Sequence, residues 1–200
     1  YKRQLGIRLT ASDEERERHP AAGFAPDDGA MPDLRLCLGG DGTVLRGLRA
    51  SAGSDVPVFG INFGEVGFLA ACDPDGIGVE EAFRLALAGD FDRLPMPGLK
   101  VGVRGAPAAF NDVCLARRPG LRIADVAYSI AGKEVGRVRC DGVVVATPAG
   151  STGYNLANGG PVVAWGVEGF AVSFIAPHSL TARALMVAPD DRVELSNLSG

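Results

Sequence analysis

The sequence predicts an α/β N-terminal Rossmann-like domain at residues 1–97, followed by an all-β C-terminal domain at 98–200. Two observations predict this division. Apolar strand patterns at 34–38 and 56–61 flank an apolar-periodic helix at 44–50, which together make a β-α-β unit. Beyond residue 97, short alternating patterns follow one another at the spacing of an all-β layer.

Composition excludes several classes of protein. Hydrophobic residues make up 46% of the 200 residues, so the chain can bury a core. A net charge of −4 without a basic stripe argues against nucleic acid as a partner. No run of 18 apolar residues and no signal peptide is present, so we expect no membrane partner and a cytoplasmic protein. Tyr1 is not a natural start, so we expect the true N-terminus to lie upstream.

The four cysteines are predicted to be free thiols. They lie far apart, form no CxxC motif and have no histidine at ligand spacing, which argues against a zinc site. Cys37, Cys114 and Cys140 lie in or beside apolar strand patterns, so we expect them to be buried in a reducing cytosol.

The remaining elements of the N-terminal part are two helices and a loop. Residues 12–18 predict a short charged helix, and the loop-forming residues 20–32 follow it. Residues 79–89 carry apolar side chains at helical spacing, with Gly89 as the cap.

A glycine turn follows the first strand of the β-α-β unit. The strand at 34–38, which we expect to be largely buried, runs into Gly39, Gly40, Asp41, Gly42 and Thr43. Strand, glycine turn and helix start let a backbone approach phosphate closely. An acid inside such a turn fits a metal ligand or a proton acceptor for an attacking hydroxyl, and it equally fits an ordinary helix cap.

The C-terminal part reads as a series of strands. The candidates are 99–103, 109–117, 124–131, 134–139, 143–146, 162–165, 171–175, 185–187 and 192–195, with a hairpin turn at Gly132 and Lys133.

A loop rich in small and hydroxyl residues follows the strand at 143–146. Ser151, Thr152 and Gly153 can hydrogen-bond a planar polar ligand, and the Tyr154 ring can stack on it. A tight crossover whose hydroxyls satisfy local backbone groups would give the same pattern.

Five stretches, in order, give the chain a resemblance to the NAD kinase family. They are GGDGT at 39–43, GINFGEVGFL at 60–69, Asn111 with Asp112, DGVVVATPAGSTGY with GGP at 141–161, and APHSL at 176–180. GGDGT is shared with lipid kinases and phosphofructokinase-like proteins, whereas the TPxGSTxY block is far more specific. The family's first βα unit and its final strands are not visible in the chain.

The resemblance implies transfer of the terminal phosphate of ATP, or of polyphosphate, to the 2′-hydroxyl of the adenosine ribose of NAD. Asp41 would be the catalytic acid at the reacting centre, and Mg²⁺ would arrive with the nucleotide phosphates, with Asp41 as its one candidate protein ligand. By the same resemblance, the donor phosphates would contact Gly39, Gly40, Gly42 and Thr43, and the dinucleotide cleft would be lined by Asn62 and Phe63. The adenosine hydroxyls would be bound by Asn111 and Asp112, and the adenine by Ser151, Thr152, Gly153 and Tyr154. The nicotinamide-side ribose would be bound by Asp141 across a subunit interface.

Several residues depart from the family pattern. Asp112 stands where the family has Glu, Ala149 replaces a hydroxyl residue, and Gly153 replaces an alanine. Arg139 either counters a ligand phosphate or pairs with Asp141, and we favour the pair.

Partners and alternatives follow from the same resemblance. We expect NAD and ATP as ligands and a homodimer or homotetramer. The alternatives are a lipid or sugar kinase that shares only GGDGT, and a dinucleotide-binding module without catalysis.

Overall fold

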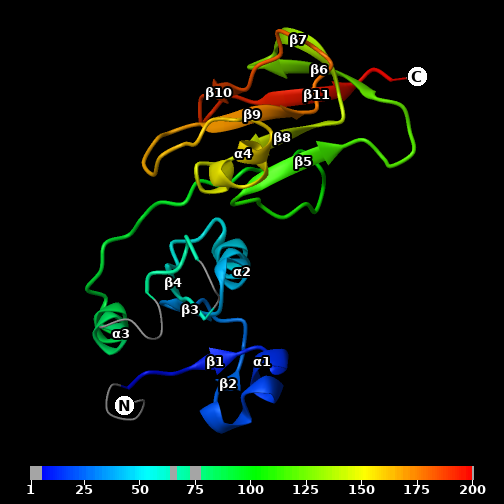
Figure 1. The fold of residues 1–200 in the computed structure, drawn as a ribbon. Coiled ribbons are helices and arrows are strands. Elements are labelled where there is room, and N and C mark those ends of the chain that lie inside the picture. The colour runs from blue at the N-terminus through cyan, green and yellow to red at the C-terminus, as the bar shows by residue number, and fades with distance from the viewer. Residues whose placement is uncertain (1–5, 64–66, 73–77, 200) are drawn as a thin grey trace.

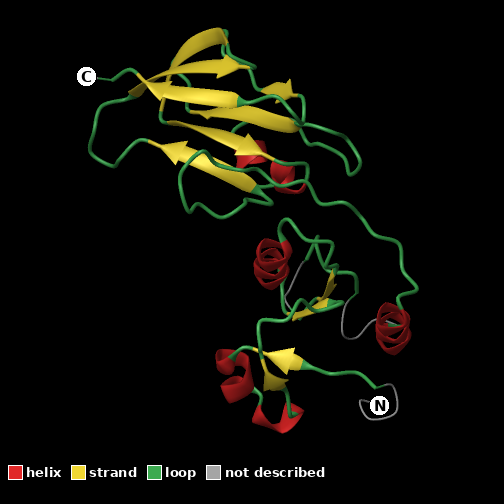
Figure 2. Cartoon of the chain, turned by 180° about the vertical axis from the view of Figure 1, so that it is seen from behind, coloured by secondary structure: helices red, strands yellow, loops and turns green. Residues whose placement is uncertain are grey.

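The computed structural model of the chain describes residues 6–63, 67–72 and 78–199. Two parts are joined by a long connection that runs from α3 to β5 (Figure 1). Helices dominate one part, and two stacked layers of strands form most of the other (Figure 2). The predicted fold class is therefore confirmed. None of the helices in the described ranges is long and apolar enough to cross a membrane.

The N-terminal part contains four short strands and three helices among its described residues. They are β1 (Thr10–Ala11), α1 (Asp13–Arg18), β2 (Ala25–Pro26), β3 (Arg35–Leu38), α2 (Asp41–Ser51), β4 (Val58–Ile61) and α3 (Val79–Ala88), with a 3-10 turn at Pro20–Ala22. The Ser12 side chain caps α1, and Gly89 ends α3 with a φ of 75°. The predicted helices at 12–18 and 79–89 are thus confirmed.

The β-α-β unit is present as predicted. Strands β3 and β4 are parallel, with Leu36 opposite Phe59, and α2 packs on them. Gly47 of α2 lies so close to Cys37 and Val58 that a Cβ there would collide with the Cys37 sulfur. The expectation that β3 is largely buried is wrong, because Leu36 and Leu38 are 37% and 54% exposed on the face that α2 does not cover.

The described residues of the C-terminal part form seven strands and short helical turns. They are β5 (Asp112–Ala116), β6 (Ala124–Ile130), β7 (Lys133–Cys140), β8 (Gly142–Ala146), α4 (Tyr154–Ala157), β9 (Phe170–Ile175), β10 (Leu185–Val187) and β11 (Val193–Asn197), with a 3-10 turn at Ala149–Thr152.

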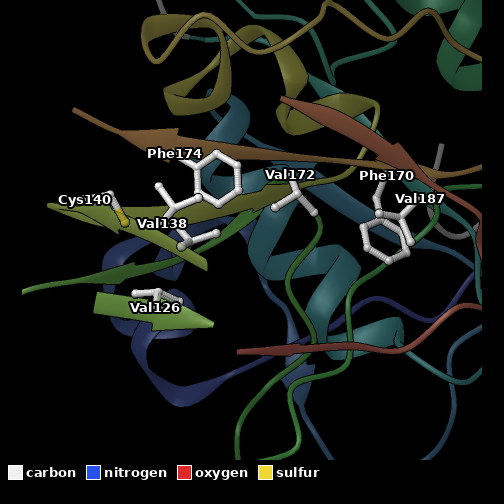
Figure 3. Close-up of a cluster of buried hydrophobic side chains, with 8 residues drawn as sticks. Val126, Val138, Cys140, Phe170, Val172, Phe174 and Val187 are labelled. Atoms are coloured by element: carbon white, nitrogen blue, oxygen red, sulfur yellow. The ribbon is translucent and has the colours of Figure 1, made fainter. Parts of the chain in front are cut away.

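Two antiparallel sheets enclose the core of this part. One has the order β10-β9-β8-β5 and the other the order β11-β6-β7. Figure 3 shows the buried side chains between them, which come from both sheets: Val126, Val138, Cys140, Val143, Phe170, Val172, Phe174 and Val187. This packing holds β8 rigidly in the middle of the larger sheet.

The other face of the larger sheet lies under α4. Val144, Ala146 and Ser173 alternate along the strands with the core residues, so they point to the opposite face. All three are fully buried, and α4 contacts both β8 and β9. The hydroxyl-rich segment, which includes α4, therefore covers a face of the sheet whose side chains are shielded from solvent.

Several sequence predictions for this part are wrong in detail. Residues 99–103 form only a bridge between Leu99 and Ala109, and 162–165 form no strand. The hairpin turn lies one residue earlier than predicted, at Ala131 and Gly132, whose φ values are 50° and 76°. Two consecutive positive φ values are typical of a two-residue type I′ turn.

None of the four cysteines forms a disulfide, as predicted, but not all are buried. Cys37 and Cys140 are buried, and burial raises the pKa of both thiols. Cys114 is exposed, contrary to prediction, because β5 is the edge strand of its sheet.

Candidate active site

The glycine turn after β3 has a conformation that needs glycine. Gly39 has a φ of 154°, and a Cβ there would lie 2.5 Å from Oγ1 of Thr43. Gly40 then caps α2, and Asp41 is the first helical residue. The turn therefore lies at the N-terminus of an 11-residue helix, where backbone N–H groups and the helix dipole favour an anion.

The end of β4 lies beside this turn. The N–H of Gly39 donates to the carbonyl of Ile61 at 3.0 Å, and the N–H of Phe63 donates to the carbonyl of Gly39 at 3.4 Å. Asn62, between them, is buried, whereas Phe63 is 61% exposed. The two strand ends thus meet at one edge of the sheet, as the carboxyl ends of parallel strands do.

Two backbone N–H groups hold the Asp41 carboxylate. Phe68 donates to Oδ1 at 3.0 Å and to Oδ2 at 3.1 Å, and Leu69 donates to Oδ1 at 3.1 Å. A Cβ on Gly67 would lie 3.1 Å from both Asp41 Oδ1 and Asn62 Cγ. Asp41 and Asn62 therefore converge on Gly67. Residues 64–66 of the predicted GINFGEVGFL motif lie outside the described residues.

The donor set around Asp41 fits a cation that arrives with phosphate. Within 6–63, 67–72 and 78–199, no group of three or more His, Cys, Asp or Glu side chains could hold a metal ion. Oδ2 of Asp41 accepts only the Phe68 N–H, which also donates to Oδ1, so it can still accept another hydrogen bond. Mg²⁺ keeps several waters and takes substrate phosphates as ligands, so it would not need a cluster of protein carboxylates.

A second group of predicted residues meets at the start of β5. Asp112 lies opposite Ala146 of β8, and the N–H of Thr147 donates to the carbonyl of Asn111 at 2.8 Å. Oγ1 of Thr147 donates to the carbonyl of Phe110 at 2.6 Å. A Cβ on Gly150 would overlap the Asn111 carbonyl. The structure thus brings Asn111 and Asp112 against the beginning of the hydroxyl-rich segment.

Partial burial of Asp112 makes the charged form of its carboxyl less favourable. It is partly buried, and burial raises the pKa of its carboxyl above the usual value of 3.8. A hydrogen-bonding ligand at this position would replace lost solvation.

The hydroxyl-rich segment is helical rather than a plain loop. Thr152, Gly153 and Tyr154 are exposed, the last at 45%. Ser151 is fully buried, and its hydroxyl donates to the Pro148 carbonyl at 2.7 Å and accepts from the Val163 N–H at 2.9 Å. The Ser151 side chain therefore supports the segment, while its three successors face solvent.

Asn155 is a supporting residue that sequence reasoning missed. Its side chain is fully buried, and Nδ2 donates to the carbonyls of Ser151 at 3.0 Å and Pro161 at 2.9 Å. Gly160 packs directly against the side-chain amide of Asn155, and its N–H donates to the backbone carbonyl of Asn155. The GGP stretch that closes the motif is therefore tied to the turn through Asn155.

Asp141 lies away from these two groups. It precedes β8, whereas Thr147 follows it, and six extended residues span about 20 Å. Within one chain Asp141 is thus separated from Asn111 by the length of the strand. Its carboxylate pairs with Arg117, whose Nε donates to Oδ1 at 2.6 Å.

The expected pair of Arg139 with Asp141 is wrong. Asp141 is the single residue between β7 and β8, and it lies beside the end of β5, where Arg117 reaches its carboxylate. Arg139 is exposed, and its carbonyl accepts the N–H of His178 at 2.7 Å. The APHSL segment is thereby fixed beside Arg139.

Known sequence families match both parts of the chain. The ATP-NAD kinase N-terminal domain matches residues 6–86, and the ATP-NAD kinase C-terminal domain matches residues 110–199. The NAD kinase of Symbiobacterium thermophilum is 38% identical and aligns with 92% of this chain and 70% of its own length. The NAD kinase of Rhodopirellula baltica is 36% identical, over 82% of this chain and 54% of its own length.

Solved structures share the fold. Yeast NADH kinase complexed with NADH superimposes with a TM-score of 0.79 at 25% identity, over 96% of this chain and 63% of that one. An NAD kinase from Archaeoglobus fulgidus in complex with ATP gives a TM-score of 0.74 at 30% identity, over 96% of this chain and 81% of that one.

The fold and the site define a class of two-part proteins in which an α/β unit carries a diglycine turn and a β-rich part carries a hydroxyl-rich turn. The chain belongs to the NAD kinase family. It spans just over half the length of some curated relatives, such as the 54% of the Rhodopirellula protein.

Proposed function

We propose that the protein transfers the terminal phosphate of ATP to the 2′-hydroxyl of the adenosine ribose of NAD, which yields NADP. The observation that carries this proposal is the Asp41 carboxylate at the N-terminus of α2, held by the N–H groups of Phe68 and Leu69 beside Asn62. An acid fixed in direction at a phosphate-binding helix end is suited to receive a proton during phosphoryl transfer.

The C-terminal part supplies the adenosine site in this proposal. Asn111 and the Asp112 carboxylate offer acceptors for ribose hydroxyls, and a ribose diol matches such a pair. Thr152 and Gly153 offer a hydroxyl and backbone groups to the adenine edge, and the exposed Tyr154 ring offers a stacking face. Ser151 and Asn155 hold this surface in place from beneath.

The reaction then needs one proton acceptor and one phosphate cradle. The 2′-oxygen attacks the γ-phosphorus, the bond from that phosphorus to the β,γ-bridging oxygen breaks, and ADP leaves. Oδ2 of Asp41 accepts the hydroxyl proton, because Oδ1 already accepts two N–H bonds. Gly39, Gly40, Gly42 and Thr43 hold the donor phosphates at the helix end. When bound with the donor phosphates, Mg²⁺ would supply neutralisation of phosphate charge.

Asp141 is proposed to act on a neighbouring subunit. The length of β8 separates it from Asn111 in its own chain, which favours contact with a dinucleotide bound to another subunit. A homodimer or homotetramer, as the family resemblance implies, would let Asp141 reach the nicotinamide-side ribose of a partner's ligand. Arg139 and His178, exposed nearby, would face phosphate at the same interface. The four free thiols fit a cytoplasmic setting.

A coupled assay tests the proposal. The purified full-length protein is incubated with Mg²⁺, ATP and NAD, and NADP is detected with an NADP-specific dehydrogenase. Parallel reactions replace ATP with polyphosphate, and NAD with NADH because a solved relative was complexed with NADH; the product of the NADH reactions is detected as NADPH. NADP formation supports the proposal. NAD binding by calorimetry without product in any reaction would indicate a binding module, and lipid phosphorylation without NAD binding would indicate another kinase class.

A further inference from the structure

The pair of Arg117 and Asp141 stands out among the ion pairs of the described residues. Most of the others join exposed side chains three or four positions apart on one element. Arg117 and Asp141 instead join the end of β5 to the start of β8, and their side chains are only 33% and 38% exposed. As a pair they are less exposed than those surface pairs, so solvent screens the interaction less.

Arg117 is anchored at three points. Its Nε donates to Asp141 Oδ1 at 2.6 Å, its NH1 group donates to the Leu121 carbonyl at 3.1 Å, and its backbone N–H donates to the Asp141 carbonyl at 2.9 Å. A guanidinium fixed by a carbonyl on one side can direct a carboxylate on the other, because its donors form a rigid fork.

We propose that Arg117 is a positioning residue that orients the Asp141 carboxylate for a ribose hydroxyl of the dinucleotide. This inference rests on the proposed function, in which Asp141 binds the nicotinamide-side ribose. Arg117 occupies Oδ1 of Asp141, which leaves Oδ2 to accept a hydroxyl. A lysine could supply the charge, but it could not hold both the carboxylate and the Leu121 carbonyl in one plane.

A purely structural ion pair is the competing explanation, and a double-mutant cycle separates the two. The proteins are the wild type, Arg117→Met, Asp141→Asn and the double variant, all full-length. Methionine keeps an apolar side chain of similar length, which matters because Arg117 also lines a cavity of about 140 Å³ with Leu115, Val143 and Leu195. NAD affinity is measured by calorimetry, and KM and kcat are measured for NAD and for ATP.

The positioning role predicts an effect on NAD alone. Arg117→Met raises the Kd and KM for NAD about tenfold, as expected for loss of a hydrogen bond to a charged group, with kcat and the KM for ATP within twofold. In the Asp141→Asn background the same substitution adds less than twofold. Arg117→Lys recovers part of the lost affinity. Arg137→Met, which breaks the exposed pair with Glu134 on β7, is the matched control and changes nothing.

Other outcomes overturn the proposal in distinguishable ways. If Arg117→Met weakens NAD binding tenfold both in the wild type and in Asp141→Asn, Arg117 does not act through Asp141. A fall in thermal stability or in assembly size by sedimentation, with unchanged NAD affinity of the folded fraction, would show a structural role only. If Asp141→Asn keeps wild-type NAD affinity, the positioning role fails while NADP formation by the wild type leaves the proposed reaction standing. Because calorimetry needs no turnover, the cycle also holds if the wild type makes no NADP.

Discussion

The N–H of Phe68 donates to both carboxylate oxygens of Asp41, at 3.0 Å and 3.1 Å, although the two residues lie on different segments of the N-terminal part. This contact fixes the direction of the carboxylate from outside its own helix. The account of the site depends on it, because a carboxylate free to rotate would lose the geometry needed for proton transfer.

Gly67→Ala tests this contact without replacing Asp41 itself. The new methyl group would lie 3.1 Å from Asp41 Oδ1 and from Asn62 Cγ, so the 67–69 segment must shift by a few tenths of an ångström. We expect kcat to fall about ten- to a hundredfold and the free energy of unfolding to fall by about 1 kcal/mol. Gly102→Ala, at a glycine with open space around it, is the control for steady-state kinetics and urea unfolding. A kcat within twofold of wild type would count against the contact.

Gly160→Ala tests the support beneath the adenosine site. A Cβ at Gly160 would overlap the Asn155 amide, whose Nδ2 lies 2.6 Å away, and Asn155 is fully buried. We expect a loss of about 2–3 kcal/mol in unfolding free energy and a higher Kd for NAD. At Gly153, in the same segment, a Cβ would meet only the Gly150 carbonyl at 3.4 Å, so Gly153→Ala is the matched control for urea unfolding alone. Equal urea midpoints for the two variants would contradict this account.

Asp112→Asn tests the electrostatic cost at the start of β5. Burial raises the pKa of Asp112 in the folded state above 3.8, so the carboxyl is protonated more readily in the folded protein than in the unfolded chain. The resulting loss of stability is absent at pH values below the pKa of Asp112 in the unfolded chain. It is complete at pH values above the pKa of Asp112 in the folded protein. Asp112→Asn should therefore raise the free energy of unfolding at pH 7 and leave it unchanged at pH 3. Urea unfolding of the wild type and the variant at both pH values measures this. A variant that is less stable than the wild type at pH 7 would contradict the expected stabilisation.

Cys114 reports on the same carboxylate through its reactivity. It is exposed, but burial of part of the side chain and the Asp112 charge raise the pKa of its thiol above 9.0. Iodoacetamide should modify it slowly at pH 8, and Asp112→Asn should speed the reaction because the thiolate becomes easier to form. Mass spectrometry assigns the site. Cys140, which is fully buried, should not react; modification of Cys140 before Cys114 would contradict the burial pattern.

Local patterns predicted most of the fold. The helices at α1, α2 and α3, the parallel β3 and β4, and most strands of the C-terminal part follow from periodicity and caps, which act within a few residues. Periodicity says which residues share a face but not what covers that face. For this reason Leu38 on β3 and Cys114 on β5 are exposed where burial was predicted.

The candidate site was predictable only as far as its motifs. Asp41, Asn62, Asn111 and Asp112 were singled out from sequence. The structure places Asp41 and Asn62 together at Gly67, and it places Asn111 against Thr147. The partner of Asp141 was not predictable, because the antiparallel register of β5 and β8 brings Arg117 beside it from 24 positions away. Asn155 gave no signal, since a single amide in a small-residue segment has no periodicity.

The most direct test of the central claim is NADP formation by Asp41→Asn, with NAD affinity measured by calorimetry on the same preparation. Asparagine keeps the shape and accepts the Phe68 N–H, but it is a far weaker proton acceptor. We expect the rate to fall at least about a hundredfold, with NAD affinity within about threefold. Asp33→Asn, at an exposed acid before β3, is the control and should keep full activity. Full activity in Asp41→Asn would contradict the role given to this carboxylate.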